Sequence, residues 1–256
     1  MKLGTPNNPR LRPEDEIAWA AEHGFDFIDL SLEPDLALPE VVDPLSIRRE
    51  LDRHSLGIVG HMAWYLPIGS PMPQMRQASV DAATAALTAF GRIGSPNATI
   101  HTHWPSHLFS VAEGLAFQIE TLRTLMPVAR RTGVQLMLEP AASWNDVPDN
   151  LASIYEAVPG LACHLDLGHC NLNGFKPADW IRRFADQLVH VHAHDNNGRE
   201  DQHLPPGTGT IDWPAAFRAL KAAGYDGTIT VESFSADRDY RCVGRDKLRR
   251  LWDSPA

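Results

Sequence analysis

The segment CHLDLGHC, residues 163–170, places a carboxylate and an imidazole at the end of a short apolar run. Asp166 closes the run, and His169 follows three positions later, with Gly168 between them. These two side-chain types transfer protons near neutral pH and bind divalent metal ions. Whether this pair does either depends on what other parts of the chain bring to the same place.

Residues of the same types end or follow several other apolar, β-branched runs. They are His61, His101, His103, Glu139, His190, His192, His194 and Glu232, and Asp201 and His203 follow in the segment REDQHLPPGTG. Taken alone, a glutamate at a strand end can cap a helix, and a lone histidine is more often structural than a metal ligand. Because such residues end six consecutive runs, we expect them to share one site.

A cluster of carboxylates at one place requires a compensating charge. Carboxylates that converge repel one another, which raises their pKa values. A divalent cation removes this conflict. Three carboxylates and one imidazole form a hard, mostly oxygen site that suits Mn²⁺, Mg²⁺ or Co²⁺, with Zn²⁺ as the alternative if further histidines join. The sequence therefore predicts a divalent-metal site.

The elements that must position these residues alternate between strand and helix. Short β-branched runs predict strands over residues 2–5, 25–30, 57–62, 97–103, 134–140, 161–168, 188–195 and 227–234. Helical patterns cover residues 13–24, 43–57, 74–94, 111–133, 150–160, 177–186 and 211–224, and a last helix runs to the C-terminus. Such alternation implies parallel strands joined by right-handed crossovers. Eight units in 256 residues predict a single (β/α)8 TIM barrel domain over residues 1–256, with an open doubly wound sheet as the competitor.

Reactive groups of TIM barrels lie at the C-terminal ends of the strands, which is where the polar residues above fall. Side chains alternate along a strand, so we expect Cys163 to point outward against the helices. His164 and His190 are expected to point inward but to lie deeper in the barrel. In the segment CHLDLGHC, Gly168 would permit a tight turn that returns His169 toward the mouth of the barrel.

The composition of the chain limits the classes of partner and the compartment that we expect for the protein. The net charge is −9, and no basic stripe is visible, which argues against nucleic acid. Three cysteines are too few for a disulfide framework and suggest a reducing compartment. The start of the chain lacks a secretory apolar region, and no apolar run of about 18 residues occurs. We expect a cytoplasmic protein without a membrane segment that acts on a small molecule.

These motifs together resemble those of the xylose-isomerase-like TIM barrel superfamily, which includes the sugar phosphate isomerases and epimerases and, more distantly, endonuclease IV. The matching segments follow in the expected order and span nearly the whole chain: GFDFIDLSLE, LMLEP, LDLGH, VHVHAHD, DQHLPPGTGTIDW and ITVESF. The resemblance implies a divalent-metal-dependent enzyme with this barrel fold. It does not specify a substrate.

Likeness to the epimerases implies a set of site residues. One metal would be held by Glu139, Asp166, His192 and Glu232, and the two glutamates would move protons on opposite faces of a bound sugar. His169 resembles a substrate-contacting histidine of the same motif. These roles imply an isomerase or epimerase of a small sugar or hydroxy-carbonyl compound that acts through a metal-stabilised enediolate.

Likeness to endonuclease IV implies a wider set and an alternative function, a multinuclear zinc phosphodiesterase. That pattern recruits His61, a strand-four histidine, Glu139, Asp166, His169, His192, Asp201, His203 and Glu232. The segment HMAWYL also places an aromatic residue three positions after the histidine, as in that enzyme's damage-reading loop. The short, acidic loops of this chain lack the basic residues needed to grip a duplex, which favours the isomerase hypothesis. Whether His101 or His103 is the strand-four ligand stays open.

Other functions and contacts are also open on the sequence. A sugar dehydratase or lyase would use the same site, and a carbohydrate-binding barrel without activity is a further alternative. Five residues are candidates for contacts at the rim of the site: Trp64, Trp104, Asn171, His194 and Arg199. The number of metals and a homodimer that closes the mouth are not decided by any motif.

Overall fold

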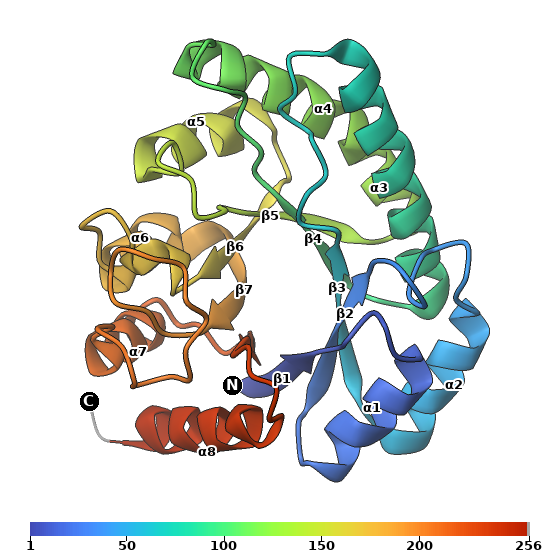
Figure 1. Cartoon of the computed structure of the whole chain (residues 1–256), viewed down its shortest axis with the longest axis vertical. Coiled ribbons are helices and arrows are strands. Elements are labelled where there is room, and N and C mark those ends of the chain that lie inside the picture. The colour runs from blue at the N-terminus through green and yellow to red at the C-terminus, as the bar shows by residue number, and fades with distance from the viewer. Residues whose placement is uncertain (255–256) are drawn as a thin grey trace.

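A computed structural model describes residues 1–254 of the chain as a closed barrel of eight parallel strands in sequential order (Figure 1). The strands are β1 (Lys2–Pro6), β2 (Phe27–Leu32), β3 (Gly57–Met62), β4 (Asn97–His101), β5 (Gln135–Glu139), β6 (Ala162–Asp166), β7 (Leu188–Ala193) and β8 (Thr228–Val231). The predicted (β/α)8 TIM barrel is confirmed, and the open-sheet competitor is excluded because β8 pairs with β1. Residues 255 and 256 of the predicted domain lie outside the described residues.

The helices surround the strands on the outside of the barrel (Figure 1). They are α1 (Pro13–Glu22), α2 (Pro44–His54), α3 (Pro73–Ile93), α4 (Val111–Thr132), α5 (Pro148–Ala157), α6 (Pro177–Phe184), α7 (Trp213–Ala222) and α8 (Asp239–Asp253). Proline in the first turn opens six of them, where its fixed φ suits the helix and its missing N–H costs nothing. α4 begins instead with a capping box, in which the side chains of Ser110 and Glu113 each accept a hydrogen bond from the other residue's backbone N–H. None of the helices within residues 1–254 combines the length and apolar character needed to cross a membrane.

Strand register brings the polar residues to one level. His101 of β4 lies opposite Glu139 of β5, and Asp166 of β6 lies opposite His192 of β7. β3, which pairs with β4, places His61 opposite Ser31 of β2. Because the strands are parallel, their C-terminal ends meet at one mouth, and these side chains converge there.

The inside of the barrel is layered. Its floor is a small apolar cluster of Phe27, Val59, Met137 and Ala162. Two residues further along the same strands, the period-2 alternation places polar side chains inward. The large apolar core lies outside the strands, between the sheet and the helices, and includes Cys163 as expected. The floor therefore closes the barrel below a polar site.

Candidate active site and metal centre

Four residues predicted as metal ligands lie together at the mouth of the barrel. The Nδ1 atom of His192 lies 3.0 Å from an oxygen of Glu232, 3.6 Å from one of Glu139 and 3.9 Å from one of Asp166. Glu139, Asp166 and His192 are fully buried, and Glu232 lies at the edge of the opening. β5, β6, β7 and the residue after β8 thus each contribute one ligand-type atom to a common point.

The polar atoms of this group fit a divalent cation. Among residues 1–254, both carboxylate oxygens of Glu139, Oδ2 of Asp166 and Nδ1 of His192 are buried without a hydrogen-bond partner. Unpartnered buried polar atoms are costly and rare, and here they converge on one point. The separations of 3.0, 3.6 and 3.9 Å from His192 Nδ1 are equal to or somewhat longer than the spacing of neighbouring ligands around one ion, about 3 Å for metal–oxygen bonds of about 2.1 Å.

The electrostatics of the group also call for a cation. Burial raises the pKa of Glu139 to about 7, because a charged carboxylate loses its hydration there. Burial would also raise the pKa of Asp166, but the neighbouring His169 and His194 hold it well below its ordinary value. A cation would stabilise both carboxylates in their charged form.

Asp29, in the middle of β2, is a site residue that the sequence analysis missed. It is fully buried, and its Oδ2 accepts hydrogen bonds from Nε2 of His192 at 2.7 Å, Nε2 of His190 at 3.1 Å and the hydroxyl of Thr230 at 2.7 Å. A proton held on Nε2 by Asp29 would leave Nδ1 of His192 as the atom that binds a metal ion among the carboxylates. The signal in the sequence was parity: Asp29 lies on the same strand face as the inward Phe27, although it is not at a strand end.

A second group of ligand-type atoms adjoins the first through Glu139. The Nε2 atoms of His61 and His101 lie 2.8 Å apart, and they lie 3.7 and 3.1 Å from Oε2 of Glu139. The strand-four residue at the site is therefore His101. The predicted extension of this strand to residue 103 is wrong, because β4 ends at His101, and the backbone N–H of His103 donates to the side chain of Gln118.

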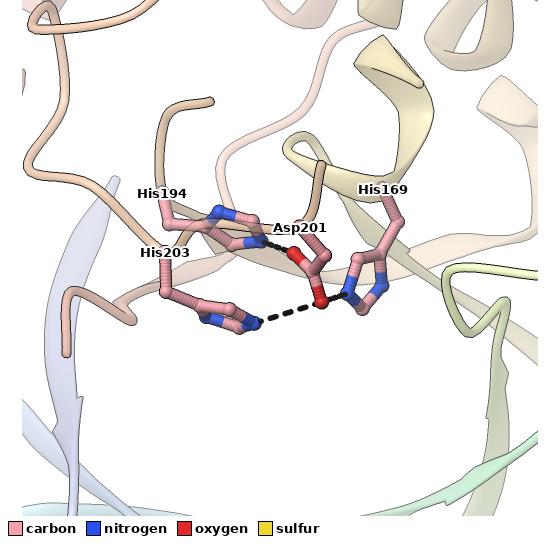
Figure 2. Close-up of side chains that lie close together, drawn as sticks. All are labelled: His169, His194, Asp201 and His203. Carbon is pink, nitrogen blue, oxygen red and sulfur yellow. Dashed lines mark hydrogen bonds and ion pairs between the residues drawn. The ribbon is translucent and has the colours of Figure 1, made fainter. Parts of the chain in front are cut away.

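A third group lies beside the first and combines His169, from the segment after β6, with His194, Asp201 and His203 from the segment after β7 (Figure 2). Figure 2 shows His169, His194 and His203 around the Asp201 carboxylate, whose oxygens lie 3.3, 3.6 and 3.2 Å from their Nε2 atoms. His169 reaches back to the mouth as predicted, and its Nδ1 donates to the carbonyl of Pro140 at 2.9 Å. Burial alone would lower the pKa of His203, but its hydrogen bond to Asp201 helps raise it to about 9.

Gly168 is needed for a different reason from the predicted one. Its φ of −67° is ordinary backbone, so no special turn requires glycine. A Cβ at this position would instead lie 2.0 Å from the ring of His194. That ring is fully buried and stacks on His203, with 3.8 Å between the centroids. The prediction of His194 as a rim contact is therefore wrong, because the glycine lets the ring pack inside.

A cavity of about 560 Å³ opens above the three groups. Its wall includes the chemistry-bearing residues His61, His101, Glu139, His169, Asp201, His203 and Glu232. The same wall also includes Asn7, Asn8, Glu33, Trp64, Phe234 and Arg241, among others. Glu139 from β5 and Glu232 after β8 thus reach the same space.

Of the predicted rim contacts, Trp64 lines the cavity and is 64% exposed. Trp104 is turned away to donate to Asp146, and Asn171 donates to Asn196 and Thr210. Arg199 is exposed on a loop outside the lining. Loop side chains were the least predictable part of the site, since no periodicity sets their direction.

Comparison with known proteins agrees with this fold. The family described as xylose isomerase-like TIM barrel matches residues 17–251. Uncharacterized protein MJ1311 of Methanocaldococcus jannaschii is 30% identical over 226 residues, covering 83% of this chain and 76% of its own. The 3-dehydro-D-guloside 4-epimerase of Escherichia coli is 24% identical, covering 98% of this chain and 99% of its own. A solved structure of a D-tagatose 3-epimerase-like protein has a TM-score of 0.88 at 25% identity, covering 98% and 97% of the two chains.

Proposed function

Because the chain belongs to the family of xylose isomerase-like TIM barrels, we propose that it is a divalent-metal-dependent epimerase or isomerase of a small sugar or hydroxy-carbonyl compound. Curated relatives and structural neighbours that are sugar epimerases support an enzyme of this kind. The single observation that carries the proposal is the convergence of Glu139 and Glu232 on one cavity above unpartnered, buried ligand atoms.

Glu139, Asp166, His192 and Glu232 would hold the cation. Their donor set suits Mn²⁺, Mg²⁺ or Co²⁺, and Zn²⁺ is the alternative. When bound, such an ion acts as a Lewis acid toward carbonyl and hydroxyl oxygens and stabilises the negative charge that builds up on deprotonation. Asp29 would keep His192 in the tautomer that binds a metal through Nδ1.

The residues around the cavity would perform the proton transfer. Glu139 and Glu232 approach it from β5 and from the end of β8, so a sugar between them offers opposite faces of one carbon. One carboxylate would remove the proton beside the carbonyl, and the other would return a proton on the opposite face. His169, whose Nδ1 is held by the carbonyl of Pro140, would turn its Nε2 from Asp201 to a sugar oxygen.

Hydrogen exchange tests this function directly. The metal-loaded protein is incubated in D₂O with a panel of ketoses and aldoses, and products are analysed by NMR. We expect deuterium on the carbon beside the carbonyl, and a loss of about 10²–10⁴-fold in E139Q and in E232Q. E22Q, an exposed glutamate on α1, is the matched control. Turnover that needs neither glutamate, or that leaves this hydrogen unexchanged, would refute the mechanism.

One observation favours a second candidate, a multinuclear metal phosphodiesterase. The ligand-type residues form three adjoining groups: His61, His101 and Glu139, then Glu139, Asp166 and His192, then His169, His194, Asp201 and His203. Elemental analysis of the wild type and of H203A separates the two functions. One ion per chain, unchanged in the variant, supports the epimerase or isomerase. Two or three ions, with one lost in the variant, would make abasic-site cleavage the next assay.

A further inference from the structure

Arg241, on the first turn of α8, lies in the cavity wall between the ends of β1 and β8. Its Nη1 donates to the carbonyl of Pro6 at 2.8 Å and to the hydroxyl of Thr5 at 3.4 Å, and its Nε donates to the carbonyl of Ser233 at 3.4 Å. Within residues 1–254, its Nη2 makes no hydrogen bond. The guanidinium is thus held on one side and presents free donors on the other.

This guanidinium has no direct ion-pair partner among residues 1–254. No carboxylate of the described chain lies within 4.0 Å of Arg241, whereas Arg238 on the same segment pairs with Glu16 at 3.0 Å and stacks on Trp19. Burial and the neighbouring Arg238 lower the pKa of Arg241, and the carboxylates of Glu16 and Glu232, which lie beyond ion-pair distance, offset this only in part. A half-buried, unpaired cation facing a cavity is stabilised when an anion enters.

Arg241 lies close to one of the two glutamates that we propose for proton transfer. Ser233, which anchors Nε, directly follows Glu232, so Arg241 lies beside the proposed proton-transfer carboxylate. Among the lining residues of the described chain, Arg241 is the only lysine or arginine. A substrate that reaches Glu139 and Glu232 with its carbonyl end can therefore extend an anionic group to Arg241.

We propose that Arg241 binds a carboxylate of the substrate, so that the enzyme acts on an acidic sugar of the uronate or aldonate class. A planar guanidinium matches a carboxylate with two parallel N–H donors. A dianionic phosphate fits less well. The wall already holds the carboxylates of Glu33, Asp201 and Glu232, and the single positive charge of Arg241 would have to offset a second negative charge on the substrate. This inference rests on the proposed function, since it names the substrate class of the same site.

Calorimetric binding tests the inference without turnover. D-glucuronate, D-glucose 6-phosphate and D-glucose are titrated into the full-length wild type, R241M and R241Q, each with Mn²⁺ and after chelation. We expect the wild type to bind glucuronate about tenfold or more tightly than glucose, the effect of one charge-assisted pair. The preference should disappear in R241M and R241Q and persist in R199M, the exposed-arginine control.

Each other outcome overturns the inference. Equal binding of glucuronate and glucose by the wild type does so even if both variants fail to fold, and so does a glucuronate preference that survives in R241M. Tighter, Arg241-dependent binding of glucose 6-phosphate would assign the cation to a phosphate instead. Persistence of the preference after chelation separates Arg241 from the metal, so a failed hydrogen-exchange assay would refute the proposed function and leave this result standing.

Discussion

At the scale of single residues, the buried carboxylate of Asp29 orients a histidine ligand of the proposed metal site. It accepts hydrogen bonds from His190 and His192, which lie 161 and 163 positions away in the chain. Burial would raise its pKa, but these hydrogen bonds hold it well below the ordinary value, so Asp29 is charged at neutral pH. Asp29 does not itself line the cavity, and it acts on the site through His192 and through His61, whose Nδ1 lies 3.5 Å from its Oδ1.

Replacing Asp29 by asparagine should weaken metal binding by about 10–100-fold, the usual cost of losing such a partner of a histidine ligand. The amide no longer favours the tautomer with the proton on Nε2 of His192. Competition titration with a chromophoric chelator measures the change. D186N, at an exposed aspartate, is the control. Unchanged metal affinity in D29N would show that Asp29 has only a packing role.

The contact between Gly168 and His194 gives a second prediction. In G168A the new methyl group would lie 2.0 Å from the imidazole, so the ring or the loop must move. We expect a loss of about 1–3 kcal/mol in the free energy of unfolding, typical of overpacking. Urea unfolding measures it. Adding H194A to G168A should recover part of the loss, and strictly additive effects would argue against this contact.

At the scale of elements, the loops after β4 and β5 are joined by a buried side chain. Asp146 accepts a hydrogen bond from Nε1 of Trp104 at 2.8 Å and another from the backbone N–H of Ser143 at 3.3 Å. Burial outweighs these bonds and raises the pKa of Asp146 to about 7. The loop that carries it follows Glu139, so its stability bears on the mouth of the barrel.

This raised pKa predicts a pH dependence of stability. Between about pH 4 and pH 7 the folded state keeps the Asp146 proton and the unfolded state has lost it, so stability falls as pH rises, by at most about 1.4 kcal/mol per pH unit. D146N should remove this contribution. Urea unfolding of the wild type and D146N from pH 4 to pH 8 measures it. Parallel curves for the two proteins would contradict the raised pKa.

At the scale of the whole molecule, the barrel closes only when β8 pairs with β1, and the ligand atoms of four successive strands then meet. An ion at this point would cross-link β5, β6, β7 and the segment after β8. Metal binding would therefore stabilise the entire fold, because the unfolded chain cannot assemble the same ligand set.

Removing metal should accordingly lower the melting temperature. Free metal at 100 times its dissociation constant contributes about 2.7 kcal/mol to the free energy of unfolding. Thermal unfolding with Mn²⁺ and with a chelator measures the shift in the wild type, in E139Q and in E22Q. We expect the shift to vanish in E139Q alone. A shift of equal size in all three proteins would place the stabilising ion elsewhere.

The sequence by itself determined the eight strand–helix units, the barrel and most of the residues at its mouth. These follow from local rules, because strand alternation and the position of strand ends can be read within a few residues. Glu139, Asp166, His169 and Glu232 were found in this way, and their metal and catalytic roles stay predictions.

Only the tertiary structure decided which side chains meet across the barrel. The place where β4 ends selects His101 over His103, the close approach of Gly168 buries His194, and Asp29 reaches His192 from the opposite side. Arg241 joins the cavity wall because α8 packs against the ends of β1 and β8. Such contacts depend on strand register and barrel closure, which join residues far apart in the chain and leave no local pattern in the sequence.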